Sequence, residues 1–239
     1  MKQNATTAAF VCAWDALPSK KGPGSIPIFA AGAAYVVRFV LGKPLGVMPM
    51  SKVKNILLVG VGGQGIILAG KLLAEVLAAG GFDVKLSEVH GMAQRGGSVV
   101  TQVRFGPQVY SPLVSPGKVD YLVAFEQIEA WRWLSWLGPG GLLIMDEQII
   151  YPAGRTQVTL PEDLTGRPGT VCLNARRIAE EAGLVKAANM VLLGALAAHL
   201  GIELEIWYRV LENSVPLKYL ESNRKALEEG FARAKPSAG

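Results

Sequence analysis

Between residues 50 and 239, short unbroken hydrophobic runs alternate with hydrophobic runs of helical spacing. Residues 56–59 are branched apolar side chains followed by Gly60, which predicts a strand buried on both faces of a parallel sheet. Apolar residues then recur at helical spacing over 69–77, and Gly80 with Gly81 is expected to end this helix. Further buried strands are expected over 83–89, 119–125 and 142–145. Strands that alternate with helices predict an α/β fold.

One segment departs from the parallel pattern. Residues 99–105 alternate apolar and polar side chains, a period of two that predicts a half-buried strand. Gly106 and Pro107 are expected to turn the chain back into an antiparallel strand over 109–114, with Pro112 placing that strand at a sheet edge. The predicted fold is therefore Rossmann-like and doubly wound, with a mostly parallel sheet and one antiparallel hairpin.

The last third of the chain is expected to be mainly helical. A short strand is predicted at 157–160, inside a segment rich in proline and glycine. Helices are expected over 174–182, 189–200, 203–211 and 217–229, the last of them charged and exposed.

The first glycine-rich turn follows the first strand. Gly60, Gly62 and Gly65 have the spacing Gly-x-Gly-x-x-Gly, in which missing side chains let backbone amides and a helix N-terminus approach an anion; Gly63 and Gln64 belong to the same turn. Glu88 lies near the end of the second strand, about 20 residues on, where a dinucleotide-binding protein places its ribose-binding carboxylate. The turn therefore suggests a phosphate-bearing ligand. Alternatively, the glycines serve only close packing of strand and helix, and Glu88 is a solvated strand end.

A second glycine-rich loop follows the second strand. In it Arg95 stands beside Gly96 and Gly97, so a guanidinium and open amides could face a carboxylate or phosphate. His90 could titrate near neutral pH, although for this residue alone a structural role is favoured. We expect the turns 60–65 and 91–98 to lie side by side at the carboxyl ends of neighbouring parallel strands.

The candidate ligand-binding residues come from these two turns. Backbone amides and Arg95 would converge on an anionic group, with Gln64 and Gln94 as neutral hydrogen-bond donors. The full candidate set is Gly60, Gly62, Gly63, Gln64, Gly65, Glu88, His90, Gln94, Arg95, Gly96, Gly97 and Ser98. No catalytic residue and no metal ligand is assigned.

Charge and composition set residues 1–49 apart from the rest. These residues contain five basic side chains and one acidic side chain, so they account for four of the net +5 charges. The remaining chain is nearly neutral and has no basic stripe, which argues against nucleic-acid binding. The apolar run over 26–37 stops at Arg38, too short to span a membrane, and Met50 resembles an ordinary protein start. We therefore expect 1–49 to be an extension outside the fold, and 50–239 to be the catalytic-type domain.

Two features bear on location and partners. Cys12 and Cys172 are far apart, so the chain offers no disulfide framework and no iron–sulfur or zinc site; a reducing cytoplasm fits best. Trp131, Trp133 and Trp136 cannot share one helix face, so some are expected to be exposed as a partner surface, with packing beneath a loop as the alternative.

Three segments together resemble a known family. Gly60-Val-Gly-Gly-Gln-Gly65, Ser87-Glu-Val-His-Gly-Met-Ala-Gln-Arg-Gly-Gly97-Ser98 and Asn189-Met-Val-Leu-Leu-Gly-Ala195 resemble the gamma-type subunits of 2-oxoacid:ferredoxin oxidoreductases. Within that family, the small (beta) subunits of the indolepyruvate type are the most similar. The resemblance runs from about Met50 to the last helix.

The resemblance implies a gamma-type Rossmann-like domain without a nicotinamide cofactor of its own. The family oxidatively decarboxylates a 2-oxoacid such as indolepyruvate, with coenzyme A accepting the acyl group and ferredoxin the electrons. Thiamine diphosphate, magnesium and 4Fe–4S clusters are expected on a large (alpha) subunit, without which this chain would be inactive. Two other interpretations remain open: a stand-alone NAD(P)-dependent reductase, which would need a positioned proton donor such as a Tyr-x-x-x-Lys pair, and a purely structural subunit.

Overall fold

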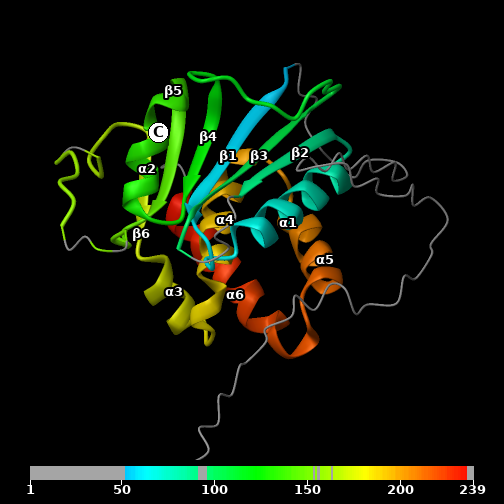
Figure 1. Ribbon diagram of the computed structural model, residues 1–239. Coiled ribbons are helices and arrows are strands. Elements are labelled where there is room, and N and C mark those ends of the chain that lie inside the picture. Colours follow the sequence, from blue (N-terminus) through cyan, green and yellow to red (C-terminus); the bar gives the residue numbers. More distant parts are fainter. Residues whose placement is uncertain (1–51, 91–95, 153, 155–156, 163, 236–239) are drawn as a thin grey trace, which may run out of the picture.

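The computed structural model describes residues 52–90, 96–152, 154, 157–162 and 164–235. They form one six-stranded sheet with helices on both faces (Figure 1). The strands are β1 (Lys54–Val61), β2 (Asp83–His90), β3 (Ser98–Gly106), β4 (Val119–Ala124), β5 (Leu137–Asp146) and β6 (Thr170–Leu173). The helices are α1 (Ile66–Ala79), α2 (Gln127–Trp133), α3 (Ala175–Glu181), α4 (Ala188–Leu200), α5 (Leu204–Ser214) and α6 (Leu217–Ala234), with the 3₁₀ helices η1 (Leu134–Trp136) and η2 (Val185–Ala187).

The sheet has the order β2-β3-β1-β4-β5-β6, so β1 is an interior strand. Residues 56–59 are fully buried, as predicted for a strand covered on both faces. β1, β4, β5 and β6 run parallel to one another. Their carboxyl ends therefore lie along one edge of the sheet, called here the carboxyl edge.

The antiparallel part of the sheet differs from the expected hairpin. β3 lies between β2 and β1 and is antiparallel to both. The predicted return strand over 109–114 is wrong, because these residues form no strand. Both hydrogen-bonding edges of β3 are already occupied by β1 and β2, and Pro112 has no N–H to offer a ladder.

A second correction concerns the far edge of the sheet. Residues 157–160 form no strand, whereas Thr170–Leu173 forms β6 and pairs with β5. This strand has only four residues, all half-buried, and so it has no distinct hydrophobic period. β6 forms because β5 offers an unpaired hydrogen-bonding edge, and the sequence of 170–173 alone does not show that this edge is available.

Two hydrophobic clusters lie on opposite faces of the sheet because successive strand side chains alternate. Ile56 and Leu58 belong to the larger cluster, under α1, α4, α5 and α6. Leu57 and Val59 belong to the smaller cluster, on the face that α2 covers. No helix in the described ranges is long and apolar enough to cross a membrane.

The contact between α4 and α6 is very close. A Cβ atom added at Gly194 would lie 2.0 Å from the carbonyl oxygen of Leu227, and one added at Gly230 would lie 1.9 Å from that of Val191. Only glycine lets the two backbones approach so closely. The expectation that the last helix is simply exposed is therefore wrong, since one side of α6 is buried against α4.

Candidate functional site

The first glycine turn connects β1 to α1 at the carboxyl edge. There is no room for a side chain at Gly60, because an added Cβ would lie 2.6 Å from Gln64 Oε1 and 2.8 Å from Phe125 Cβ. Gly65 caps α1 with φ of +79°, and its Cβ would lie 2.8 Å from Asn189 Nδ2 of α4. Gly63 differs: its φ is +107°, and nothing lies within 4 Å of its Cβ position. The turn thus exposes its backbone to open space at Gly63.

Gln64 holds this turn to the neighbouring strand. The backbone N–H of Val61 donates to Gln64 Oε1 at 2.7 Å, and Gln64 Nε2 donates to the carbonyl oxygen of Phe125 at 2.6 Å. The sequence suggested a donor to a ligand, whereas in the structure this amide links the end of β1 to the residue that follows β4. The sequence around Gln64 gave no sign of this structural role, because the carbonyl that it binds is 61 residues away along the chain.

The second glycine loop meets the first at its described end. The N–H of Gly62 donates to the carbonyl oxygen of Gly97 at 2.8 Å, and the N–H of Gly96 donates to that of Gly62 at 3.5 Å. The first turn therefore lies beside the described end of the second loop, as expected. The expectation that the two turns follow neighbouring parallel strands is wrong, because β3 lies between β1 and β2. Gly96 has φ of +76° and open space above its Cβ position, like Gly63. Gln94, Arg95 and the side chain of His90 lie outside the described residues.

Glu88 is placed differently from the ribose-binding carboxylate of a dinucleotide fold. Its side chain is only 3% exposed, so it is not a solvated strand end. It lies on β2, opposite Thr101 of β3, and β3 separates it from β1. In the dinucleotide arrangement the acidic residue ends a strand beside the glycine-turn strand. Because β3 is inserted between β2 and β1, the strand that carries Glu88 is not next to the strand that leads into the glycine turn.

A small cavity of about 120 Å³ lies beside the joined turns, between β1, β3, α2 and the segment after β5. Its lining includes Gly96, Ser98, Glu126, Glu129, Arg132 and Tyr151. Two of these residues are buried carboxylates, Glu126 being 1% and Glu129 3% exposed. The carboxyl edge thus combines open glycine backbone with a compact acidic cluster.

The two carboxylates are held by different partners. Glu126 caps α2 by accepting from the backbone N–H groups of Ile128 and Glu129, and at 3.3 Å from that of Ile150. Burial raises the pKa of Glu126, and these backbone donors oppose the rise. The Ser98 hydroxyl donates to Glu129 at 2.6 Å.

Glu129 has two further partners on its own helix. The indole N–H of Trp133 donates to it at 3.1 Å, and Arg132 Nε lies 3.4 Å away, on a side chain that is 52% exposed. Sequence reasoning missed Glu129 and Arg132. Their spacing of three residues, directly after a buried strand, was the available signal.

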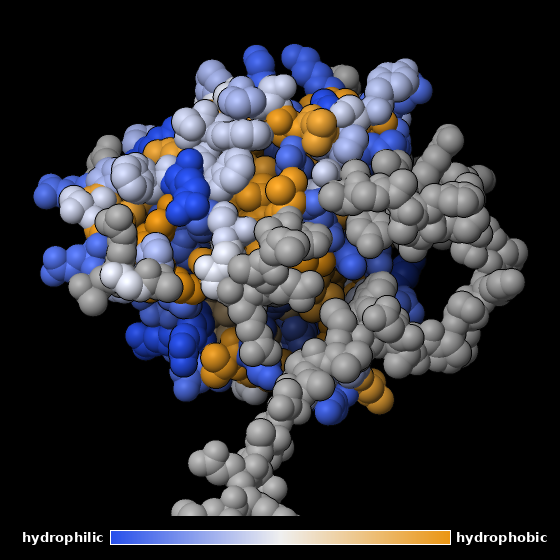
Figure 2. Space-filling view, viewed as in Figure 1, coloured by the Kyte–Doolittle hydropathy of each residue, from blue (hydrophilic) through white to orange (hydrophobic). Residues whose placement is uncertain are grey.

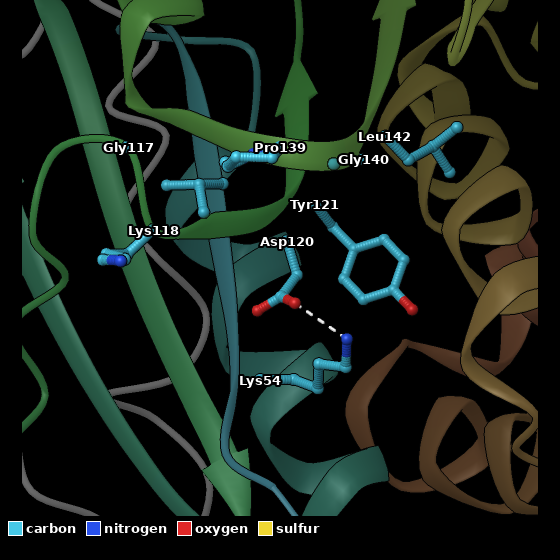
Figure 3. A pocket seen from close by; sticks show the side chains of 11 residues that line it. Lys54, Gly117, Lys118, Asp120, Tyr121, Pro139, Gly140 and Leu142 are labelled. Atoms are coloured by element: carbon cyan, nitrogen blue, oxygen red, sulfur yellow. Dashed lines mark hydrogen bonds and ion pairs between the residues drawn. The ribbon is translucent and has the colours of Figure 1, made fainter.

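The larger cavity, about 300 Å³, lies at the opposite edge of the sheet, where β1, β4 and β5 begin (Figure 3). Lys54 and Asp120 point toward each other there and form an ion pair of 2.8 Å. The hydrogen bond to Asp120 raises the pKa of Lys54, and the Asp120 carboxylate balances the charge of this cation. Tyr121 donates to the carbonyl oxygen of His199 at 3.2 Å. No glycine turn leads into a helix among the residues lining this cavity, so the carboxyl edge is the better candidate for the ligand site of an open α/β sheet.

Metal ligands do not gather within the described part of the chain. No group of three or more His, Cys, Asp or Glu side chains there is arranged to hold a metal ion. Cys172, on the edge strand β6, is half-buried, and burial raises the pKa of its thiol. The thiol is therefore kept protonated and weakly reactive.

An open α/β sheet with joined glycine turns at its carboxyl edge defines a Rossmann-like binding domain. The model of the pyruvate ferredoxin/flavodoxin oxidoreductase family matches residues 55–233, and the chain belongs to this family. Indolepyruvate oxidoreductase subunit IorB of Thermococcus kodakarensis is 39% identical over 199 residues, which are 77% of this chain and 98% of that protein. 2-Oxoglutarate synthase subunit KorC of Methanothermobacter marburgensis is 28% identical over 183 residues, which are 74% of this chain and 94% of that protein.

Solved structures share the fold. The gamma subunit of a keto/oxoacid ferredoxin oxidoreductase from Geobacter sulfurreducens is 30% identical, with a TM-score of 0.59 over 76% of this chain and 98% of that one. The 2-oxoglutarate:ferredoxin oxidoreductase of Magnetococcus marinus is 24% identical, with a TM-score of 0.61 over 77% of this chain and 31% of that one. In the latter protein the same fold is one part of a longer chain.

Proposed function

We propose that this chain is the small subunit of a 2-oxoacid:ferredoxin oxidoreductase of the indolepyruvate type. The complex would convert an arylpyruvate, coenzyme A and oxidised ferredoxin into the acyl-coenzyme A, carbon dioxide and reduced ferredoxin. The observation that carries the proposal is the similarity, over nearly their whole length, to subunits named for indolepyruvate oxidoreductase. A matching large subunit is the partner that such a small subunit needs.

The joined glycine turns are the part of this chain that we assign to ligand binding. Gly63 and Gly96 both have positive φ and open space where a side chain would stand, so an anionic group can approach their backbone. Arg95, one residue before Gly96, would supply the charge that a phosphate of coenzyme A or a 2-oxoacid carboxylate requires. His90, Gln94 and Ser98 belong to the same proposed site, whereas Glu88 is left out of it because it is buried and β3 separates it from the first turn.

The redox and thiamine chemistry is assigned to the large subunit. A 4Fe–4S cluster takes four thiolates, and this chain has two cysteines in total. Thiamine diphosphate, when bound with magnesium on the large subunit, would supply the carbanion chemistry of decarboxylation. The role left to this chain is to bind and orient an anionic substrate group. Ferredoxin would meet the complex through the other subunit, in the cytoplasm.

Reconstitution tests this proposal. The purified chain, the large subunit of the same organism and their mixture are assayed for viologen reduction with indolepyruvate and coenzyme A. We expect activity from the mixture only. Reduction by the isolated small subunit would contradict the subunit assignment, and NAD(P)H oxidation by that subunit with a 2-oxoacid would favour a stand-alone reductase.

A further inference from the structure

Large apolar side chains reach the surface mainly around the carboxyl edge. Ten such residues are exposed among those the structure describes. Six of them form what we call the apolar rim: Leu68, Val89, Trp131, Ile149, Tyr151 and Val185. The visible face in Figure 2 is mixed, with hydrophobic patches between hydrophilic ones, so the grouping follows from the positions of these residues in the fold.

The topology brings three rim residues to this edge from neighbouring elements. Leu68 is in the first turn of α1, directly after the glycine turn, and Val89 is the penultimate residue of β2. β2 is antiparallel to β3, which is antiparallel to β1, so β2 ends at the same edge as β1. Val185 opens η2, just before α4, whose Asn189 amide packs against Gly65.

The other three rim residues come from the two segments that line the acidic cavity, α2 and the chain after β5. Ile149 and Tyr151 follow the carboxyl end of β5, and Tyr151 lines the cavity. Trp131 is on α2 and is 46% exposed, whereas Trp133 and Trp136 pack edge-to-face with ring centroids 4.9 Å apart. The exposed-tryptophan expectation is thus met by Trp131 alone. The rim therefore has members on both faces of the sheet, on elements that adjoin the joined glycine turns or the cavity.

The cavity at the centre of the rim is too small to enclose a substrate. It measures about 120 Å³, whereas pockets that bury a small-molecule ligand measure roughly 300–1,000 Å³. A second protein surface laid over the glycine turns would complete the enclosure and would cover the apolar side chains around it. The site is therefore incomplete on this chain alone.

The edge is also large enough for a stable contact. Six strands about 4.8 Å apart, with helices about 10 Å thick on both faces, give an edge of about 24 by 30 Å, or roughly 700 Å². A standard interface buries roughly 800 Å² on each partner.

We propose that the apolar rim is the surface on which the large subunit docks, so that the substrate site forms between the two chains over the joined glycine turns. This inference rests on the proposed function and adds to it the face of the partner contact. The docking surface of the large subunit is accordingly expected to be apolar where it covers the rim.

Affinity for the large subunit tests the docking surface. The full chain, its Trp131→Glu and Val185→Glu variants, and the control Tyr110→Glu are each titrated against the purified large subunit by calorimetry. Trp131 and Val185 belong to opposite faces of the sheet, and Tyr110 is 85% exposed in the loop after β3, at the other edge. A charge buried within an apolar contact should raise Kd by at least about 30-fold for both rim variants, with no change for Tyr110→Glu. Melting temperatures verify that each variant is folded.

Each outcome decides the matter. Weaker binding by both folded rim variants, with unchanged binding by the control, supports the docking surface. Wild-type affinity in both rim variants, or an equal loss in Tyr110→Glu, overturns it while leaving the proposed function intact. Failure of the unmodified chain to bind the large subunit at all overturns the proposed function, and the docking surface with it.

Discussion

Replacing Gln64 with alanine tests whether this side chain serves the fold or the ligand. The Gln64 amide makes two hydrogen bonds, one from the N–H of Val61 and one to the carbonyl of Phe125. Both partners are backbone groups at the ends of adjacent parallel strands. Gln64→Ala removes both bonds and leaves these partly buried groups without their partner.

The size of the effect follows from the two bonds. Each bond contributes about 1–1.5 kcal/mol net, so we expect a loss of about 2–3 kcal/mol in the free energy of unfolding. A domain of this size loses about 2–4 °C of melting temperature per kcal/mol, which gives a decrease of about 4–12 °C. Thermal unfolding followed by circular dichroism measures this decrease directly.

Gln127→Ala is the matched control. It removes a single exposed hydrogen bond, from Gln127 Nε2 to the carbonyl of Glu147 at 2.6 Å, near the same edge of the sheet. We expect a loss of about 1 kcal/mol or less, and so about 4 °C at most. If Gln64→Ala melted like wild type but raised the KM for coenzyme A in the assembled complex, the structural account of this amide would be wrong and the ligand role would hold.

Three further predictions concern the loop, the extension and the helix contact. Arg95→Ala should raise the KM for coenzyme A or the 2-oxoacid about 10- to 100-fold in steady-state assays of the complex, because a charge-assisted contact is lost; Arg155→Ala is the control, and normal assembly with unaltered kinetics in Arg95→Ala would leave the loop as scaffold. A chain beginning at Met50 should melt and assemble like the full chain, and a decrease of several degrees on truncation would count against an unpacked extension. Gly230→Ala places a methyl group 1.9 Å from a carbonyl oxygen of α4 and should cost about 1–3 kcal/mol, or about 2–12 °C. Gly166→Ala, where nothing lies within 4 Å, should leave the melting temperature unchanged, and equal melting of the two variants would refute the close-contact argument.

The sequence by itself determined the elements whose signals are local. The unbroken run at 56–59 became the buried interior strand, because a strand covered on both faces needs apolar side chains at every position. Asn174 is the first residue of the helix predicted over 174–182, and it caps α3 by accepting from the N–H of Arg177. Gly201, with φ of +66°, ends α4 directly after the helix predicted over 189–200. The motifs of the two glycine turns likewise indicated the family that the comparison with known proteins established.

Only the tertiary structure decided which elements are neighbours. β3 pairs with both β2 and β1, and no single segment of the sequence shows which strand edges will pair. This pairing places β3 between Glu88 and the glycine turn. The role of Gln64 depends on a carbonyl that follows β4, and Glu129 reaches Ser98 only because α2 returns over the carboxyl edge. Side-chain patterns report burial and local backbone preference, whereas strand order and the partners of polar groups are set by the packing of distant segments.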